Sequence, residues 1–401
     1  MASVLVIGGQ GRIGGRVAFD LLKYTNAQVT VTGRQLSTSE ASLPDYAVNE
    51  SRWTSSTLDL DNREQLTQAI ASHDLIIHCA GPFHYRDTRV LKACIDQGVD
   101  YLDVSDCAPF TQQALALHDA AQAAGITAII NTGVFPGISN SMVRLCMETF
   151  AQKTPQMSAQ SSPQQNSQQT ERQAKTIRLY YAVAGSGGAG VTVLRTTFLG
   201  LQKPFQVWIN GQWQQKLPYS DRQVVQFPKP YGKVGLYWYE VPETITLAQS
   251  FPVQTVVTKF GSIPDIYNRL TWMVARWFPS SWIQDPSMIE SLSQVSYKMT
   301  QVSDRFSGTG IAMRVEVTDS VDVAGNDSDR LTTSGSQPQM HAITLTHPDT
   351  AIAAGAGTGS LAQLILARRL HQPGVYPVEA ALPTALFQEV MTARRIHLTH
   401  G

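Results

Sequence analysis

A glycine-rich turn near the start of the chain has the residue types that bind a phosphate group. Residues 4–15 read VLVIGGQGRIGG, which fits Gly9-x-Gly11-x-x-Gly14 and Gly8-x-x-Gly11-x-x-Gly14 equally well. Such glycines allow a tight turn, close approach of the backbone to a pyrophosphate, and close helix–strand packing. The anion would lie at the N-terminus of the following helix, where N–H groups are free. We therefore expect a dinucleotide site with contacts from the whole turn: Gly8, Gly9, Gln10, Gly11, Arg12, Ile13 and Gly14.

The end of the second expected strand indicates which dinucleotide is preferred. A site for NAD usually places Asp or Glu about 20 residues beyond the glycine turn, where the carboxylate binds the ribose. In this chain the strand at 28–32 is followed by Gly33 and Arg34, with no carboxylate. An arginine suits a 2′-phosphate, which it can bind through two parallel hydrogen bonds. The sequence thus favours NADP(H) as cofactor, with NAD(H) the weaker alternative.

The elements that would position these residues alternate between strand and helix through the first 150 residues. This order predicts an α/β fold with a doubly wound parallel sheet, the Rossmann arrangement. Ligands bind such sheets at the carboxyl ends of the strands. Asp59 ends the third expected strand and is a candidate contact on the adenosine side. The segment after the fourth strand is expected beside the ribose and nicotinamide, with Ala80, Gly81, Pro82 and Phe83 as contacts.

Reduction of a double bond by hydride also requires a proton donor, and three residues near strand ends are the candidate catalytic groups: His84, Tyr85 and Asp103. His84 has a side chain that titrates near neutral pH, although a loop histidine bonded to the backbone has the same sequence context. For Tyr85 the same two roles, catalytic and structural, stay open. Asp103 either polarises a donor or caps the region of Pro109.

Four further polar residues have open roles. Asp106 is another possible proton donor in the same cleft. Cys107 is reactive only if its pKa is lowered, and a buried inert thiol is the commoner case. Asn140 and Arg144 follow the sixth expected strand, where they either bind a substrate carboxylate or serve as a helix cap and a surface charge.

Composition limits the classes of partner. The chain has 401 residues with 31 basic and 31 acidic side chains, so it offers no electrostatic basis for binding nucleic acid. No apolar stretch is long enough to span a bilayer, and no signal peptide is evident. The four cysteines show no metal-ligand spacing, so no metal site is expected. A small-molecule substrate and a cytoplasmic location are the expectations.

The composition also suggests domain limits. We expect a dinucleotide-binding domain at 1–150, a Gln- and Ser-rich linker or insertion at 151–175, a second α+β domain with a mostly antiparallel sheet at 176–348, and a C-terminal helical segment at 349–401 that packs back on the first domain. The second domain would hold the substrate or form a dimer. Among its expected strands is 191–199, which is rich in β-branched residues.

Two other segments have characteristic patterns. The aromatic stripe of residues 266–282, with three tryptophans, suits a domain core or substrate-pocket wall, a subunit contact, or a membrane-surface helix, in that order of preference. The glycine-rich run at 354–359 is expected to precede a helix at 360–371. A last amphipathic helix is expected at 383–395.

Several of these segments together resemble the saccharopine dehydrogenase-like oxidoreductases. The resemblance rests on GGQGRIGG, CAGPF, YLDVSD, TGVFPGISN and GVYPVEAAL, and it is looser across the middle of the chain. It implies a Rossmann domain that binds NAD(P), a second domain on an antiparallel sheet, and a substrate in the cleft between them. It assigns Gly8, Gly11, Gly14 and Arg34 to the cofactor, with 80–83 and 133–137 at the nicotinamide end.

Two functions of different classes follow. The first is NADP(H)-dependent hydride transfer to or from a C=N, C=O or activated C=C bond of a small metabolite, by a protein that is expected to be a homodimer. The second is a non-catalytic NADP(H)-binding sensor or scaffold. The short-chain dehydrogenase mechanism is disfavoured, because no tyrosine is followed four residues later by the lysine that would lower its pKa.

Overall fold

The computed structural model describes residues 1–34, 50–153, 173–188, 190–283, 285–321 and 338–401. It contains the expected doubly wound parallel sheet, whose strands are β1 (Ser3–Ile7), β2 (Gln28–Gly33), β3 (Trp53–Thr57), β4 (Leu75–His78), β5 (Asp100–Asp103), β6 (Thr127–Ile130) and β15 (Gly374–Pro377). Their order is β15-β6-β5-β4-β1-β2-β3, and every pair is parallel. The central strands are continuous apolar runs because helices cover both faces of the sheet.

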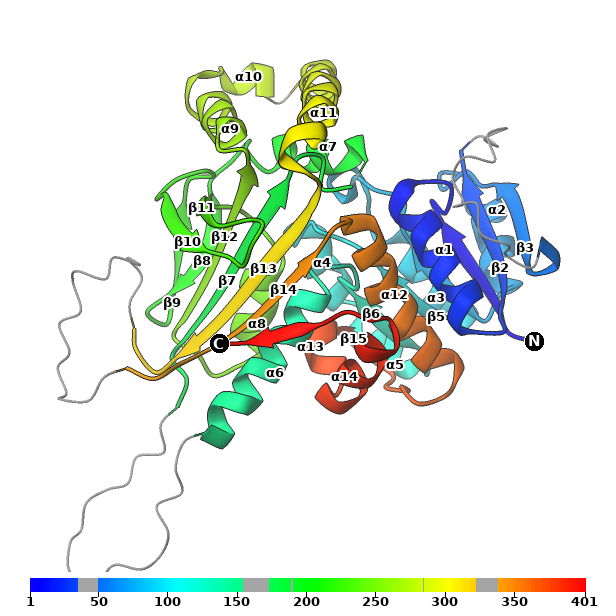
Figure 1. The fold of residues 1–401 in the computed structure, drawn as a ribbon. Helices are drawn as coiled ribbons and strands as arrows, with labels where there is room; N and C mark the ends of the chain where they lie inside the picture. The colour runs from blue at the N-terminus through cyan, green and yellow to red at the C-terminus, as the bar shows by residue number, and fades with distance from the viewer. Residues whose placement is uncertain (35–49, 154–172, 189, 284, 322–337) are drawn as a thin grey trace, which may run out of the picture.

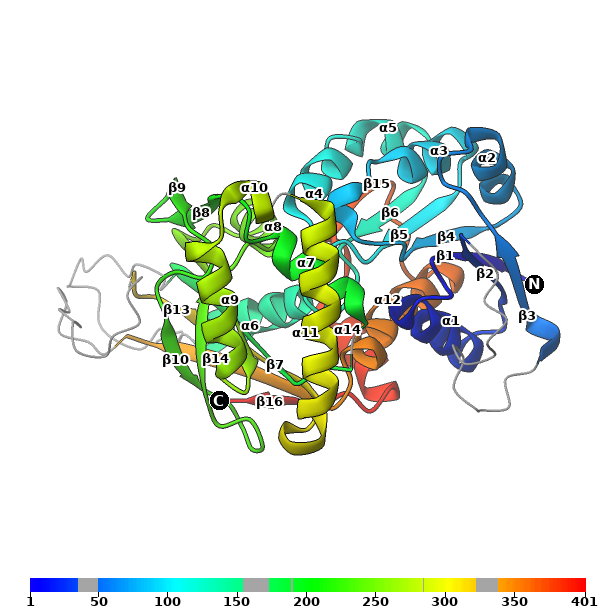
Figure 2. The ribbon, with the colours of Figure 1, turned by 90° about the horizontal axis from the view of Figure 1, so that it is seen from above.

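The helices of this first unit follow the strands in alternation: α1 (Arg12–Tyr24), α2 (Arg63–Ala71), α3 (Arg89–Gln97), α4 (Ala108–Leu115), α5 (His118–Ala123) and α6 (Ile138–Lys153), with 3-10 helices η2 (Glu50–Arg52) and η3 (Phe83–Tyr85). Figure 2 shows α2, α3 and α5 on one face of the sheet and α1 on the other. The alternation places every βα loop at one edge of the sheet, where a ligand can contact several of them.

A second sheet lies beside the first and is mostly antiparallel (Figure 1). Its strands are β7 (Thr176–Ala184), β8 (Phe205–Ile209), β9 (Gln212–Lys216), β10 (Gln223–Gln226), β11 (Lys233–Trp238), β12 (Thr255–Ile263), β13 (Gly310–Thr318), β14 (Met340–His347) and β16 (Leu398–His400). The main order is β10-β11-β12-β7-β13-β14-β16, with β8 paired to β12 and β9 paired to β8. Only β7 and β12 run parallel among these described strands. The expected α+β character of this unit is therefore confirmed.

The helices of the second unit are α7 (Val191–Leu199), α8 (Glu243–Ser250), α9 (Ile266–Trp277), α10 (Ser280–Ile283) and α11 (Pro286–Ser307). The expected strand at 191–199 is wrong, since this segment is α7. Its β-branched residues favour a strand locally, but Gly190 begins the helix with extended backbone and Arg195 forms an ion pair with Glu290 of α11. Packing against α11 thus overrides the local propensity.

Contrary to expectation, the glycine-rich run at 354–359 does not precede the helix but forms part of it. It lies inside α12 (Thr350–Leu366), a helix that packs along α1. A Cβ atom on Gly355 would lie 2.8 Å from the Arg16 backbone, and one on Gly359 would overlap the Asp20 side chain. The absence of side chains therefore allows α12 to approach α1 closely, which compensates for the low helix propensity of glycine.

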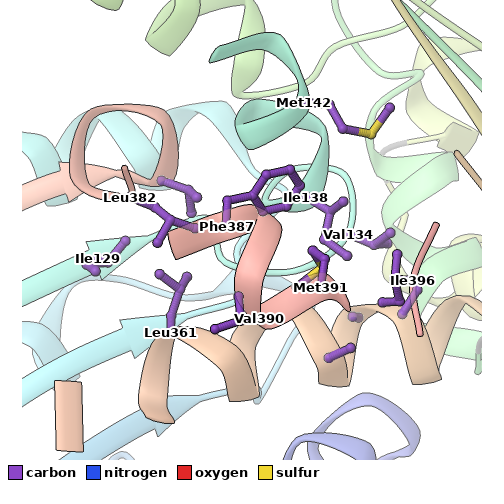
Figure 3. Packing of buried hydrophobic residues seen from close by; sticks show 14 of the residues in the cluster. Ile129, Val134, Ile138, Met142, Leu361, Leu382, Phe387, Val390, Met391 and Ile396 are labelled. Carbon is purple, nitrogen blue, oxygen red and sulfur yellow. The ribbon is translucent and has the colours of Figure 1, made fainter. Parts of the chain in front are cut away.

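The C-terminal segment contains strands as well as helices. Besides α12, α13 (Val378–Ala381) and α14 (Thr384–Ala393), it provides β15 to the first sheet and β16 to the second. Figure 3 shows α14 within the shared core, where Phe387, Val390 and Met391 pack near Leu361 of α12 and Ile129 of β6. The expected return to the dinucleotide-binding unit thus includes strand pairing that the sequence analysis did not anticipate.

The tryptophan-rich stripe lies at the surface and not in a core. Trp272, Trp277 and Trp282 are 37, 68 and 52% exposed, and Trp272 contacts Trp277 edge to face. The preferred interpretation as a core or pocket wall is wrong, because α9 buries only Asn268 fully. No helix within the described ranges is both long and apolar enough to cross a bilayer. The expected linker at 151–175 falls largely at 154–172, outside the described residues.

Candidate functional site

A cavity of about 350 Å³ lies at the carboxyl ends of the parallel strands and is closed on the far side by α7. Most of the expected cofactor contacts line it, namely Gly8, Gln10, Gly11, Arg12, Ile13, Gly14, Arg34, Asp59, Ala80, Gly81, Pro82 and Phe83. The structure therefore brings together residues from four separate βα loops. Gly9 and the three expected catalytic residues His84, Tyr85 and Asp103 are not among the lining residues.

The glycine turn is built for close backbone contact. Gly8 has a φ of +76°, and a Cβ there would lie 2.8 Å from the backbone of Ala80. A Cβ on Gly14 would overlap the Gly8 carbonyl oxygen. Gly11 begins α1, and no side chain caps its first turn. The free N–H groups at this helix end therefore face the cavity, as an anion site requires.

Gly9 has a structural role. A Cβ at this position would lie 2.6 Å from the Val31 side chain of β2. It lets the turn pack on the neighbouring strand and does not itself border the cavity. The strand–turn–helix geometry thus needs glycine for the tight turn, for the close backbone approach and for packing against the neighbouring strand.

Charged side chains gather at the end of the cavity where β2 and β3 terminate. Arg34, Asp59 and Asp61 line this end together with Arg86, which follows η3. Burial and the charge of Arg34 lower the pKa of Arg86, so the two guanidinium groups interact. Sequence reasoning missed Arg86, because it stands two residues beyond His84 in a loop without a phosphate-binding pattern.

The opposite wall comes from the second unit. Gly190, Thr192, Val193 and Thr196 of α7 and its N-cap line the cavity. Arg12 at the start of α1 joins the two units: its Nε donates to the Gly188 carbonyl and its Nη2 lies 3.0 Å from Asp349 Oδ2. The four lining residues of α7 and its N-cap were not anticipated, because residues 191–199 were expected to form a strand, whereas Arg12 was expected at the site.

The three expected catalytic residues differ in their surroundings. His84 is partly buried, which lowers its pKa to about 4 and leaves the ring neutral near pH 7. Tyr85 is 54% exposed, and burial raises its pKa. Asp103 is fully buried, and its Oδ1 accepts hydrogen bonds from the amides of Ser105 and Asn131, at 3.0 and 2.9 Å. Asp103 thus organises the loops after β5 and β6.

Asp106 is a third carboxyl group of the cavity, besides Asp59 and Asp61. It lines the cavity together with Phe83, Val104 and Thr196 of α7. Burial raises the pKa of Asp106 to about 6, although a hydrogen bond with Thr196 acts to lower this pKa. The carboxyl is therefore able to exchange a proton near neutral pH. Its neighbour Cys107 is buried, which raises the thiol pKa to about 12 and keeps it protonated.

Asn140 and Arg144 are structural and lie away from the cavity. Asn140 Nδ2 donates to Glu379 Oε2 at 2.8 Å, and its Oδ1 accepts from the Gly137 amide. Arg144 donates to the carbonyl oxygens of Glu379 and Leu382, both at 3.1 Å. Both residues therefore tie α6 to α13. Among the described residues, no three His, Cys, Asp or Glu side chains are grouped as metal ligands.

The residues of the cavity fit a dinucleotide. The cradle formed by Gly8, Gly11 and Gly14 would be filled by side chains at these positions, and the start of α1 presents uncapped N–H groups beside it. A guanidinium at Arg34 adds positive charge at the adenosine end. Backbone donors and a positive charge at this spacing suit the phosphates of such a ligand.

Comparison with known proteins agrees with this geometry. Residues 4–129 match the family described as saccharopine dehydrogenase NADP binding domain. A probable mitochondrial saccharopine dehydrogenase-like oxidoreductase of Arabidopsis thaliana is 24% identical over 51% of this chain, and the match spans about half of that relative, 49% of its length. The resemblance that the sequence motifs suggest is therefore confirmed.

The fold is similar over its full length to a solved structure. The saccharopine dehydrogenase (L-Glu forming) of Saccharomyces cerevisiae superposes with a TM-score of 0.66 at 13% identity, covering 100% of this chain and 99% of that one. The two chains therefore share the arrangement of their two sheets.

Proposed function

We propose that the protein, whose residues 4–129 match the family described as saccharopine dehydrogenase NADP binding domain, is an NADP(H)-dependent oxidoreductase. It transfers a hydride to or from a C=N, C=O or activated C=C bond of a small metabolite. One observation carries the proposal: the cavity combines the glycine turn of the first unit with a wall, α7, from the second. A substrate can enter between two such surfaces and contact both.

The cofactor would be held by residues of the first unit. The turn from Gly8 to Gly14 would bind the pyrophosphate, Arg34 and Asp59 the adenosine end, and 80–83 the nicotinamide end. When bound, NADP(H) supplies the hydride chemistry, and the protein supplies binding, orientation and electrostatics. The preference for NADP over NAD rests on Arg34 and on the lack of a carboxylate at the end of β2.

Asp106 is our candidate for the proton donor and acceptor. Its carboxyl lines the cavity, whereas His84, Tyr85 and Asp103 do not. With a pKa of about 6, a fraction of Asp106 is protonated near neutral pH. Thr196 would orient the carboxyl, and Asp103 would act as a positioning residue for the loop that carries Asp106. Tyr85 is exposed, and the charges of Arg195 and Glu290 act on its pKa.

The test is a fluorescence titration of NADPH and NADH on the wild-type protein and on Gly11→Val, followed by a screen for substrate-dependent oxidation of NADPH. A Cβ at Gly11 meets only the Gly8 carbonyl, at 3.1 Å, so the variant should fold while its side chain obstructs the phosphate site. We expect tight NADPH binding that Gly11→Val removes, with an unchanged thermal melting curve.

Two results would count against the proposal. Absence of nicotinamide nucleotide binding to the wild type removes the cofactor site altogether. Binding without oxidation, across amines, imines, carbonyl compounds and activated alkenes, supports the non-catalytic sensor or scaffold. The cytoplasmic location and the homodimer stay predictions, and sedimentation analysis of the purified protein checks the second.

A further inference from the structure

Two arginine side chains from separate loops line one end of the cavity. Arg34 follows β2 directly, and Arg86 follows η3 after β4. Burial is the main cause that lowers the pKa of Arg86, and the positive charge of Arg34 is the next. The fold thus holds two like charges near each other at a place open to a ligand. The two like charges repel each other, and the carboxylates of Asp61 and Asp87 offset this in part by raising the pKa of Arg86.

The backbone fixes Arg86 in this position. Its Nε donates a hydrogen bond of 2.8 Å to the carbonyl oxygen of Ala80, within the segment that lines the middle of the cavity. The guanidinium is a rigid plane, so anchoring Nε sets the direction of the two Nη groups. An anchored guanidinium loses less freedom when it binds than a mobile one.

The acidic residues at this end are already engaged. Arg89 forms ion pairs with both Asp61 and Asp87, the second with Nε 2.8 Å from Oδ1. Asp59 accepts the Asp61 amide at 3.0 Å. Arg89 is thus the ion-pair partner of both Asp61 and Asp87, while the formal charges of Arg34, Arg86 and Arg89 equal those of Asp59, Asp61 and Asp87.

We propose that Arg86 and Arg34 together bind the phosphate monoester on the adenosine ribose, and that Arg86 is therefore a second determinant of the choice of NADP over NAD. The inference rests on the proposed function for the presence of a dinucleotide. A phosphate monoester is close to a dianion at pH 7 and accepts several hydrogen bonds, so two guanidinium groups match its charge and geometry. NAD carries a ribose hydroxyl at this place and gains little from either arginine.

Isothermal titration calorimetry tests the proposal on the full chain. The ligands are NADPH, NADH, adenosine 2′,5′-bisphosphate and 5′-AMP, and the variants are Arg86→Ala, Arg34→Ala, the double variant and Arg86→Lys. Arg63→Ala is the matched control, because Arg63 is exposed at the start of α2 and does not line the cavity. Melting curves verify that each variant folds.

We expect Arg86→Ala to weaken NADPH and the bisphosphate by about 10-fold or more, and to change NADH and 5′-AMP by about twofold or less. The affinity of Arg86→Lys for NADPH should lie between those of the wild type and Arg86→Ala, since lysine keeps the charge and loses the paired hydrogen bonds. The double variant should lose less than the product of the two single losses, because both side chains contact one group.

Three outcomes separate the inference from the proposed function. If no nucleotide binds the wild type, the function itself fails. If NADPH binds and only Arg34→Ala weakens it selectively, Arg86 has no part in the choice and the inference is wrong. If Arg86→Ala weakens all four ligands equally, Arg86 merely holds the Ala80 loop, and the inference is again overturned. If Arg86→Ala does not fold, the same comparison of NADPH with NADH is made on Arg86→Lys, and an unchanged preference for NADPH overturns the inference.

Discussion

Arg394, the residue after α14, and Asp20 of α1 form a nearly fully buried ion pair, with Nη2 and Oδ1 2.6 Å apart and side-chain exposures of 2 and 9%. Arg394 also donates through Nη1 to Gln363 Oε1 of α12 at 3.0 Å. One guanidinium therefore joins three helices. It fixes α1, the helix that starts at the glycine turn, to the C-terminal segment.

Loss of this pair should destabilise the whole protein. Arg394→Met leaves the Asp20 carboxylate buried without its partner, which costs about 3 kcal/mol or more in the free energy of unfolding. Urea denaturation followed by circular dichroism measures this. Arg369→Ala is the control, because its paired Glu389 joins the same region at the surface and its loss should leave the midpoint nearly unchanged. Equal shifts in the two variants would contradict the prediction.

Gly355 should be intolerant of a side chain. Gly355→Leu forces α12 away from Arg16 of α1, an overpacking that costs about 1–3 kcal/mol. Because α1 carries the glycine turn, NADPH affinity should fall together with the melting temperature. Ile352→Ala serves as control, since Ile352 is 40% exposed on the same helix. A variant with unchanged stability and affinity would show that the two helices are free to separate.

Glu243 should make stability depend on pH. Its Oε1 accepts hydrogen bonds from the hydroxyls of Tyr181 and Ser139, at 2.9 and 3.0 Å. Burial raises the pKa of Glu243 from 4.5 to about 7, and the charge of the buried Glu379 contributes to this rise. Between these values the folded protein holds a proton that the unfolded chain lacks. Stability therefore falls as pH rises from about 4.5 to 7, by at most about 3 kcal/mol, and stays lower above pH 7.

Glu243→Gln removes this titration. The melting temperature of the variant should change less than that of the wild type between pH 5 and pH 8, with Glu389→Gln, an exposed carboxyl, as control. Differential scanning calorimetry in buffers of constant ionic strength measures both. Parallel curves for wild type and Glu243→Gln would refute the assignment.

Asp106 should set the pH dependence of the reaction. In the direction of reduction the protonated carboxyl is the active form, so kcat/KM should fall as pH rises through about 6. Asp106→Asn should lower kcat about 100-fold or more and flatten the profile, with NADPH affinity retained. Cys107→Ser, at a buried neighbour that does not line the cavity, should leave the profile in place. An unchanged profile in Asp106→Asn would assign the proton to another group.

Patterns that are local in sequence could be predicted. The turn at Gly8–Gly14, the buried strands and the lack of a carboxylate beside Arg34 each depend on neighbouring residues, and they give the parallel sheet and most of the cavity lining. The site formed because parallel strands end at one edge, which the order of elements already implies.

Features that depend on distant contacts could not be predicted. β15 is a short segment that forms a strand through its pairing with β6, whose residues 127–130 lie far from it in the sequence. The β-branched residues of α7 favour a strand until α11 is in place, and Gly355 disfavours a helix until α1 lies against it. Arg86 required the same information, because no motif marks it as a neighbour of the cavity, whereas Asp106 follows a strand end and was a candidate from the sequence.

The pairing of β15 with β6 has a consequence for synthesis of the protein. The chain leaves the ribosome from its N-terminus, yet the edge of the first sheet beside β6 stays open until residues 374–377 emerge. Through most of translation this edge presents unpaired backbone groups, on which another strand can assemble. A nascent chain arrested before that point would therefore be expected to need a chaperone, even though all the residues of its glycine turn have long been made.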